Sequence, residues 1–202
     1  MHRVLLTAYG PYDDWAVNAS WLVLQEVVRE IPTHIELVTR LYPVEFAQVR
    51  QRLSDDLGLG FDTVLALGQA PGRSRIALEK VGLNVACDRG IRAEDALPLE
   101  PDGPPAYFSS LPLKRWAEQL RSEGVPAEVS HHAGTYLCNA ALYWSHHFAT
   151  LSGQQTQASF LHLPLASEQV LNSPREYPSL PVDLMAAGVR RLLDDLSTGP
   201  LV

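Results

Sequence analysis

Short apolar runs alternate with longer segments of helical periodicity along the chain. Apolar runs bounded by Gly, Pro and Asp are typical of buried strands, and they occur at 3–8, 35–41, 63–67, 127–130 and 158–163. Apolar positions three and four residues apart predict helices at about 18–30, 43–57, 113–123, 137–148 and 182–196. Residues 76–85 show strand-like alternation as well. Strands that alternate with helices indicate an α/β sandwich with a largely parallel sheet.

Turn and capping residues indicate where these elements begin and end. Asn18 or Ser20 can cap the first helix, and Pro43 is suited to open the second, because proline is tolerated in a first helical turn. Residues from about 90 to 105 are rich in Pro, Asp and Gly, and such long excursions are often functional. Sites in α/β sheets collect at the carboxyl ends of the strands. The prediction places at those ends Tyr9, Gln69, residues 135–138 and His162.

The composition agrees with one globular domain spanning residues 1–202. Apolar residues make up 46% of the chain and charged residues 19%, and neither a repeat nor a linker interrupts the pattern. The formal charge of −7 and the lack of a dense Lys/Arg run argue against nucleic-acid binding. No apolar run approaches the roughly 18 residues that would span a bilayer, and the N-terminus is typical of a strand and loop, not of a signal peptide.

The two cysteines, Cys87 and Cys138, do not make a disulfide framework in a chain of this length. Free thiols are typical of the cytoplasm, which is the location we expect. Cys87, in NVACDRG, has no candidate base nearby and is expected to be inert.

Cys138 stands at the start of a predicted helix, in HHAGTYLCN. In a first helical turn, free backbone N–H groups and the helix dipole favour a thiolate, and the same N–H groups could stabilise an oxyanion. Gly134 would let the backbone approach a substrate closely. The alternative is that Cys138 is a small buried apolar residue on a core helix.

A cysteine nucleophile requires a base and a residue that orients the base. His162, near the end of the strand ASFLHLP, is the natural base, although a histidine there could equally be satisfied by a backbone carbonyl. Glu79 is a carboxylate inside the apolar stretch RIALEKVGLNV, and a buried carboxylate is unfavourable unless it is paired. The alternatives are that Glu79 faces solvent beside Lys80, or that Asp88 is the orienting carboxylate.

Two histidine pairs, His131–His132 and His146–His147, could together suggest a metal cluster. Neither pair has the i, i+4 spacing of ligands on one helix, and a zinc site requires three or four converging ligands. We therefore predict no metal site, and we expect His146 and His147 to cover a helix surface.

Five segments, in order, resemble those of the cysteine-type pyroglutamyl peptidases, also called pyrrolidone-carboxylate peptidases. The most specific is SHHAGTYLCNAALYW, which is similar to the cysteine motif S-x-x-AGTYLCN of that family. SFLHLPLASEQV resembles its histidine segment, F-I-H-(I/V)-P-x-x-P-E-Q. The other three are VLLTAYGPYDDWAVNASW, GQAPGRSRIALEKVGLNVA and DGPPAYFSSLPLKRW. The resemblance extends from about residue 3 to residue 170.

The resemblance implies a three-layer α/β/α sandwich around a largely parallel, mixed and twisted sheet, of the phosphorylase/hydrolase-like kind. It implies that Cys138 is the nucleophile, His162 the general base and Glu79 the residue that orients the imidazole. Arg89 falls at the arginine of the family's N-x-x-D-A-R stretch, which implies support of the oxyanion or of the cysteine loop. No cofactor is implied.

The resemblance also implies an activity. Such enzymes are cysteine exopeptidases, or omega-peptidases, that hydrolyse the N-terminal pyroglutamyl residue from peptides through a thioester acyl-enzyme. The expected partners are small peptides that begin with pyroglutamate, and a homo-oligomer is compatible with the resemblance because similar proteins often form dimers or tetramers. Two alternatives are a cysteine hydrolase of another small acyl or amide substrate, and a non-catalytic ligand-binding protein on the same scaffold.

The implied substrate slot is where this chain departs from the family. A pyroglutamyl ring has no free amine, so its slot needs apolar walls and an amide partner. By the resemblance, Tyr9 and Tyr12 stand for two phenylalanines, the backbone around Gln69 pairs with the lactam amide, and Asn18 braces the loop. The tyrosines add hydroxyls that need hydrogen bonds, and Asp-Asp at 13–14 replaces Gly-Gly, which stiffens the loop and makes its rim acidic.

Overall fold

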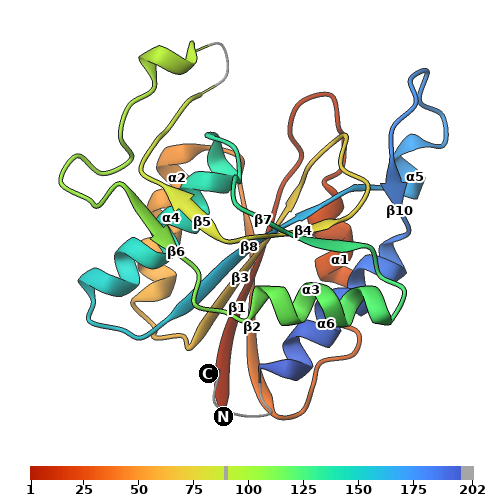
Figure 1. The fold of residues 1–202 in the computed structure, drawn as a ribbon, viewed down its shortest axis with the longest axis horizontal. Coiled ribbons are helices and arrows are strands. Elements are labelled where there is room, and N and C mark those ends of the chain that lie inside the picture. The colour runs from red at the N-terminus through yellow and green to blue at the C-terminus, as the bar shows by residue number, and fades with distance from the viewer. Residues whose placement is uncertain (89–90, 197–202) are drawn as a thin grey trace.

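In the computed structural model, which describes residues 1–88 and 91–196, a six-stranded sheet forms the centre of the molecule (Figure 1). The strand order is β2-β1-β3-β8-β4-β7, and the described pairings are parallel except for that of β4 with β8. The predicted largely parallel, mixed sheet is therefore confirmed. The strands are β1 (His2–Tyr9), β2 (Ile35–Tyr42), β3 (Thr63–Gln69), β4 (Ile76–Glu79), β7 (Ala127–Ser130) and β8 (Gln157–Leu163).

Helices cover both faces of this sheet, so the predicted three-layer sandwich is also confirmed (Figure 1). Each face has its own apolar cluster, because the central strands are buried on both sides and supply side chains to both. On one face lie α1 (Ala19–Val27), α3 (Leu113–Ser122) and α6 (Val182–Asp195). On the other lie α2 (Phe46–Leu57) and α4 (Leu137–Leu151).

Three of the predicted helix boundaries are wrong, one of them the end of α4, which continues to Leu151 and does not stop near residue 148. The second helix begins at Phe46 and not at Pro43, since β2 continues to Tyr42 and the chain then crosses the end of the sheet before Glu45 caps α2 in an extended conformation. The first helix ends at Val27 and not near residue 30, although Asn18 is its N-cap as predicted.

The alternation at 76–85 is not one strand. It is divided between β4 and β5 (Val81–Leu83), and all four residues of β4 are buried because β8 and β7 flank it and both faces are covered. Some elements are too short to give a periodic signal and were not predicted. They are β6 (Ala106–Phe108), β9 (Leu165–Ala166), β10 (Ser179–Leu180), α5 (Ser167–Val170) and the 3-10 turn Ala93–Asp95.

The expectation that His146 and His147 cover a helix surface is wrong, because both side chains are buried in α4. The antiparallel pair of β5 and β6 packs over the side of α4 that would otherwise face solvent. From β6, Tyr107 stacks on the His146 ring and its hydroxyl lies 3.1 Å from Nδ1 of His147. Burial lowers the pKa of His146 to about 4, and a hydrogen bond with the backbone of Ala158 opposes this only in part.

The buried His146 should make the fold acid-sensitive. Unfolded histidine titrates near 6.5, so between pH 6.5 and 4 the unfolded chain binds more protons at this position, and the free energy of unfolding falls as the pH falls. We expect His146 to account for a loss of about 2 to 3 kcal/mol between pH 7 and 4.5. His146→Phe retains an aromatic ring against Tyr107 and should show a correspondingly smaller loss in urea denaturation at the two pH values. An equal loss in both proteins would contradict this assignment.

Candidate active site

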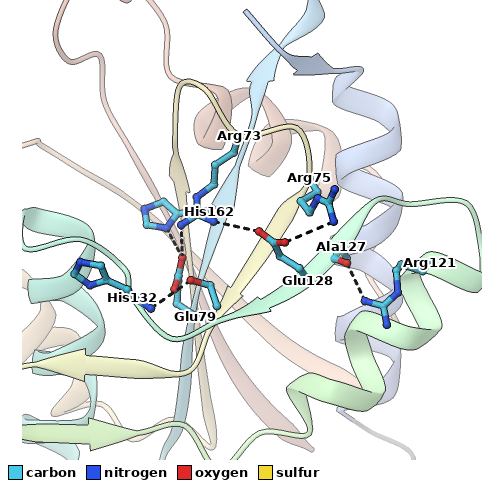
Figure 2. Close-up of polar contacts among 9 residues, drawn as sticks. Arg73, Arg75, Glu79, Arg121, Ala127, Glu128, His132 and His162 are labelled. Carbon is cyan, nitrogen blue, oxygen red and sulfur yellow. Dashed lines mark hydrogen bonds and ion pairs between the residues drawn. The ribbon is translucent and has the colours of Figure 1, made fainter.

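His162 and Glu79 meet on one face of the sheet because β4 runs antiparallel to β8. That register pairs Ala77 with His162 and Glu79 with Phe160. Paired residues, and residues two apart on a strand, share a face, so Glu79 and His162 are diagonal neighbours. Nδ1 of His162 donates to Oε1 of Glu79 over 2.8 Å, as Figure 2 shows. Glu79 is 0% exposed, so the alternative that it faces solvent is wrong.

Cys138 approaches the same histidine from α4. It is the second residue of the helix, as predicted, and it is near enough to His162 to act on the charge of the imidazole. Because Nδ1 of His162 is held by Glu79, Nε2 is the ring nitrogen left for the thiol. No side chain in the described residues caps the start of α4, so first-turn N–H groups stand beside Cys138 without a side-chain acceptor.

Gly68 of β3 makes this close packing possible. A Cβ at this position would lie 2.3 Å from Cζ of Phe160 and 3.4 Å from Sγ of Cys138. The first distance is far below van der Waals contact, so any larger residue would displace Phe160, which lies between His162 and the core. The thiol can thus lie this close to the sheet because glycine at position 68 has no side chain.

The electrostatics favour a protonated imidazole at His162. Burial by itself would lower the pKa of His162, but the charge and hydrogen bond of Cys138 and those of Glu79 outweigh it and raise this pKa to about 9. Burial would raise the pKa of Glu79, but hydrogen bonds from His162 and Ser130 and the charge of Arg73 outweigh it and hold this pKa below its ordinary value. The arrangement can therefore hold an imidazolium at His162 beside a carboxylate at Glu79 near neutral pH.

The cysteine loop is fixed by backbone contacts and by one buried amide. Asn139, 0% exposed, accepts from the N–H of Leu83 over 2.8 Å and donates to the carbonyls of Leu83 and Val85 over 2.9 and 3.0 Å. The carbonyl of Thr135 accepts from the N–H of Cys87 over 2.8 Å. The 83–87 segment is thereby attached to the start of α4 and supports the nucleophile position.

Gly134 has a backbone conformation that favours glycine. A Cβ at this position would meet no protein atom within 4 Å, so packing within the protein does not require the glycine, and its role in the approach of a substrate stays a prediction. Its φ is +81°, in the left-handed region that glycine adopts without strain. Gly134 therefore turns the chain into α4.

A cavity of about 80 Å³ opens beside Cys138 at the carboxyl ends of β1 and β3. All four residues predicted to bind substrate line it. Tyr9 is buried, with its ring centroid 6.1 Å from that of Phe160, and the Tyr12 hydroxyl donates to the Gln69 carbonyl over 3.3 Å. The full lining is Tyr9, Tyr12, Asn18, Val44, Gly68, Gln69, Tyr136, Leu137 and Cys138.

Asn18 and Gln69 hold the loop over this cavity. Asn18 donates to the carbonyl of Gly10 over 3.0 Å, as expected for a brace, and its side-chain oxygen accepts from Ser20. Oε1 of Gln69 accepts from the N–H of Ala19 over 2.7 Å and from the amide of Gln169 over 2.8 Å. Asn18 thus joins the two ends of the 10–18 loop, and Gln69 attaches the end at Ala19 to β3.

Other sequence candidates do not join the cluster. Asp88 is exposed, and it is Glu79, not Asp88, that accepts the hydrogen bond of His162. His131 and His132 are exposed, and residues 1–88 and 91–196 contain no group of three or more His, Cys, Asp or Glu side chains that could hold a metal ion. Arg89 lies outside the described residues.

Comparison with known proteins identifies the family of this chain. A family model described as pyroglutamyl peptidase matches residues 2–196. The chain belongs to the pyroglutamyl peptidase family. Curated pyrrolidone-carboxylate peptidases from Thermococcus onnurineus and Streptomyces coelicolor are each 38% identical, over 90% and 96% of this chain and 92% and 91% of theirs. The crystal structure of a pyrrolidone carboxyl peptidase from Fervidobacterium islandicum AW-1 superposes with a TM-score of 0.91 at 31% identity, covering 97% of this chain and 98% of that one.

Sequence reasoning missed two members of this pyroglutamyl peptidase site. Asn139 directly follows Cys138 in AGTYLCN. Because a buried amide in a core helix needs hydrogen-bond partners, its position in the sequence is a signal for such a contact. Arg73 donates to Oε1 of Glu79 over 3.1 Å. Its only sequence signal is its place in the loop after β3, six residues before the carboxylate.

Asn139→Ala should lower both stability and turnover. It removes the side-chain partner of the Leu83 N–H and of the Val85 carbonyl, and one of the two donors to the Leu83 carbonyl, so we expect a loss of roughly 2 to 4 kcal/mol in urea unfolding. The first turn of α4 loses its anchor, so kcat should fall as well.

Asn84→Ala is the matched control. Asn84 makes three similar hydrogen bonds, to the backbones of Glu100 and Gly103, but none to α4. Its loss should lower stability and spare kcat in the folded fraction. A similar loss of kcat in both variants would show that Asn139 has no particular role at the nucleophile.

Proposed function

We propose that Cys138, His162 and Glu79 carry out the reaction of this family, the hydrolysis of an N-terminal pyroglutamyl residue from small peptides. The observation that carries the proposal is the buried 2.8 Å bond of His162 with Glu79, beside a helix-start thiol and a small slot. A nucleophile, a base and an orienting carboxylate within reach of one another are the requirement for covalent acyl transfer.

The proposed reaction has two stages. The Cys138 thiolate attacks the pyroglutamyl carbonyl while first-turn N–H groups of α4 stabilise the oxyanion, and the His162 imidazolium gives its proton to the departing amine. A thioester remains. His162, now neutral, takes a proton from water, which attacks the thioester and expels the thiolate. Glu79 keeps Nδ1 protonated throughout, so Nε2 is the nitrogen that exchanges protons.

The slot suits a compact, uncharged ring. The rings of Tyr9 and Tyr12 provide apolar walls, and the only ionisable lining group besides the tyrosines is Cys138, among the residues that the structure describes. A lactam would need an amide partner, for which the Gln69 backbone is placed at the end of β3. Arg89 falls outside the described residues, and its support of the oxyanion is a proposal from the resemblance alone.

The altered loop favours one alternative substrate class. Tyr12 already donates to the Gln69 carbonyl. A lactam N–H that paired with this carbonyl would therefore share it with the Tyr12 hydroxyl. Asp13 adopts a φ of +58°, which asparagine and aspartate tolerate better than other side chains, so the loop retains a glycine-like turn despite its sequence. A cysteine hydrolase of another small acyl or amide substrate is therefore the second candidate.

We also propose that the protein acts in the cytoplasm, because both of its cysteines are free. None of the helices within residues 1–88 and 91–196 is long and apolar enough to cross a membrane. The net charge of −7 supports partners other than nucleic acid. A homo-oligomer stays a prediction from the resemblance.

The decisive test is hydrolysis of an L-pyroglutamyl fluorogenic amide by the purified protein and by Cys138→Ala. We expect cleavage that disappears in the variant, since no other nucleophile in the described residues faces the slot. Cys87→Ala is the matched control and should retain activity. Appreciable cleavage by Cys138→Ala would reject the mechanism. No cleavage by a protein whose Cys138 is rapidly alkylated by iodoacetamide would favour the other hydrolase, and a slow thiol would favour a binding protein.

Glu79→Gln should change both the rate and the pH profile. Without the carboxylate, the pKa of His162 falls from about 9, so the alkaline limb of kcat/KM moves to lower pH. Loss of the oriented imidazole should lower kcat by roughly 10²-fold or more. Asp88→Asn removes the exposed carboxylate and should leave the profile unchanged. If Asp88→Asn moved the limb and Glu79→Gln did not, the orienting role would belong to Asp88.

A further inference from the structure

Arg73 contacts Glu79 beside His162, as Figure 2 shows. It belongs to the loop between β3 and β4, where its N–H bonds the carbonyl of Ala70 over 3.2 Å and Gly72 turns the chain with a φ of +93°. Its guanidinium reaches back to the sheet, as Figure 2 shows, and donates to Oε1 of Glu79 over 3.1 Å. This is the same oxygen that accepts from Nδ1 of His162.

The guanidinium is held at two points. Its other nitrogen, Nη1, lies 3.4 Å from Oε1 of Glu128 on β7, and Arg75 lies 3.6 Å from the second oxygen of Glu128 (Figure 2). Glu79 is fully buried, whereas Glu128 is 41% exposed. The planar fork of Arg73 therefore connects the buried carboxylate of the triad to a carboxylate at the protein surface.

We propose that Arg73 is a positioning residue, which locks the Glu79 carboxylate toward His162 and sets the pH range in which the Cys138–His162 pair works. This inference rests on the catalytic roles proposed above. A fully buried carboxylate needs more than one partner, because its desolvation is poorly offset by a single hydrogen bond. Two donors on one oxygen, one of them permanently charged, leave the carboxylate little freedom to rotate away from the imidazole.

The charge of Arg73 acts on every titratable group around it. His162 on β8 faces Cys138 on α4 and Glu79 on β4, and Glu79 also faces Arg73 and, from β7, Ser130. Glu128 and Arg75 lie beyond Arg73. Tyr9 of β1 also faces Cys138, and burial raises its pKa so that it stays neutral. A nearby positive charge lowers the pKa of acids and bases alike. Its removal should therefore move both the acidic and the alkaline limb of the pH–activity profile to higher pH.

The test compares Arg73→Met with Arg75→Met. Both variants remove one positive charge that pairs with Glu128, but only Arg73 contacts Glu79. For Arg73→Met we expect kcat for the pyroglutamyl amide to fall about tenfold or more with KM little changed, and both limbs of the profile to move upward by roughly half a unit or more. Arg75→Met should match the wild type. Unchanged kcat and limbs in Arg73→Met, or equal shifts in both variants, would overturn the proposal.

Arg73→Lys separates charge from geometry and covers the case in which Arg73→Met does not fold. Lysine keeps the positive charge but lacks the fork that reaches two carboxylates, so the limbs should stay near their wild-type positions while kcat falls several-fold. Wild-type kcat in Arg73→Lys would contradict the positioning role.

The pH dependence of Cys138 alkylation by iodoacetamide, resolved from Cys87 by peptide mass spectrometry, gives a readout that needs no substrate. If the wild type did not cleave the pyroglutamyl amide, the proposed function would fail. The Arg73 proposal would then still be judged by whether Arg73→Met, and not Arg75→Met, moves the alkylation profile upward.

Discussion

The hydrogen bond between His162 and Glu79 is the interaction on which the site depends, because it gives a fully buried carboxylate inside the sheet one of its partners. An isolated ionised carboxylate at 0% exposure would be strongly unfavourable. The fold meets this constraint by turning β4 against the direction of β8, which brings Glu79 diagonally beside His162. The one antiparallel pairing among the described strands of the large sheet is thus also the one that brings together the proposed base and its orienting carboxylate.

The nucleophile is positioned by a separate, steric constraint. Cys138 reaches the histidine because Gly68 leaves room for Phe160 and the thiol at the end of β3. Asn139 then attaches the first turn of α4 to the segment after β5. Hydrogen bonding therefore sets the position of the base, and close packing sets that of the thiol. The two residues come from opposite directions and neither depends on the loop that covers the slot.

Much of this could be predicted from the sequence, and the reasons for the misses are physical. Apolar runs and helical periodicity located the principal strands and helices, and AGTYLCN placed Cys138 in a first helical turn. Glu79 could not be chosen from spacing, since its partner lies 83 positions away and only the antiparallel register brings the two together. His146 was misplaced because β6, which buries it, is only three residues long and carries no periodic signal. Arg73 could not be predicted because an arginine in a loop is usually solvated, and only the structure shows that its guanidinium contacts Glu79.

The loop over the slot lies on an element different from those that carry the proposed catalytic residues, although Cys138 also lines the slot. Tyr12 and the 13–14 pair lie on the loop after β1, whereas Cys138, His162 and Glu79 lie on α4, β8 and β4. Asn18 and Gln69 hold the loop through backbone groups of Gly10 and Ala19, which any side chains at 12–14 would leave intact. The side chains at 12–14 therefore lie apart from the contact between His162 and Glu79. The loop can vary without changing that contact, whereas Gly68 and Cys138 belong both to the lining of the slot and to the packing that positions the thiol.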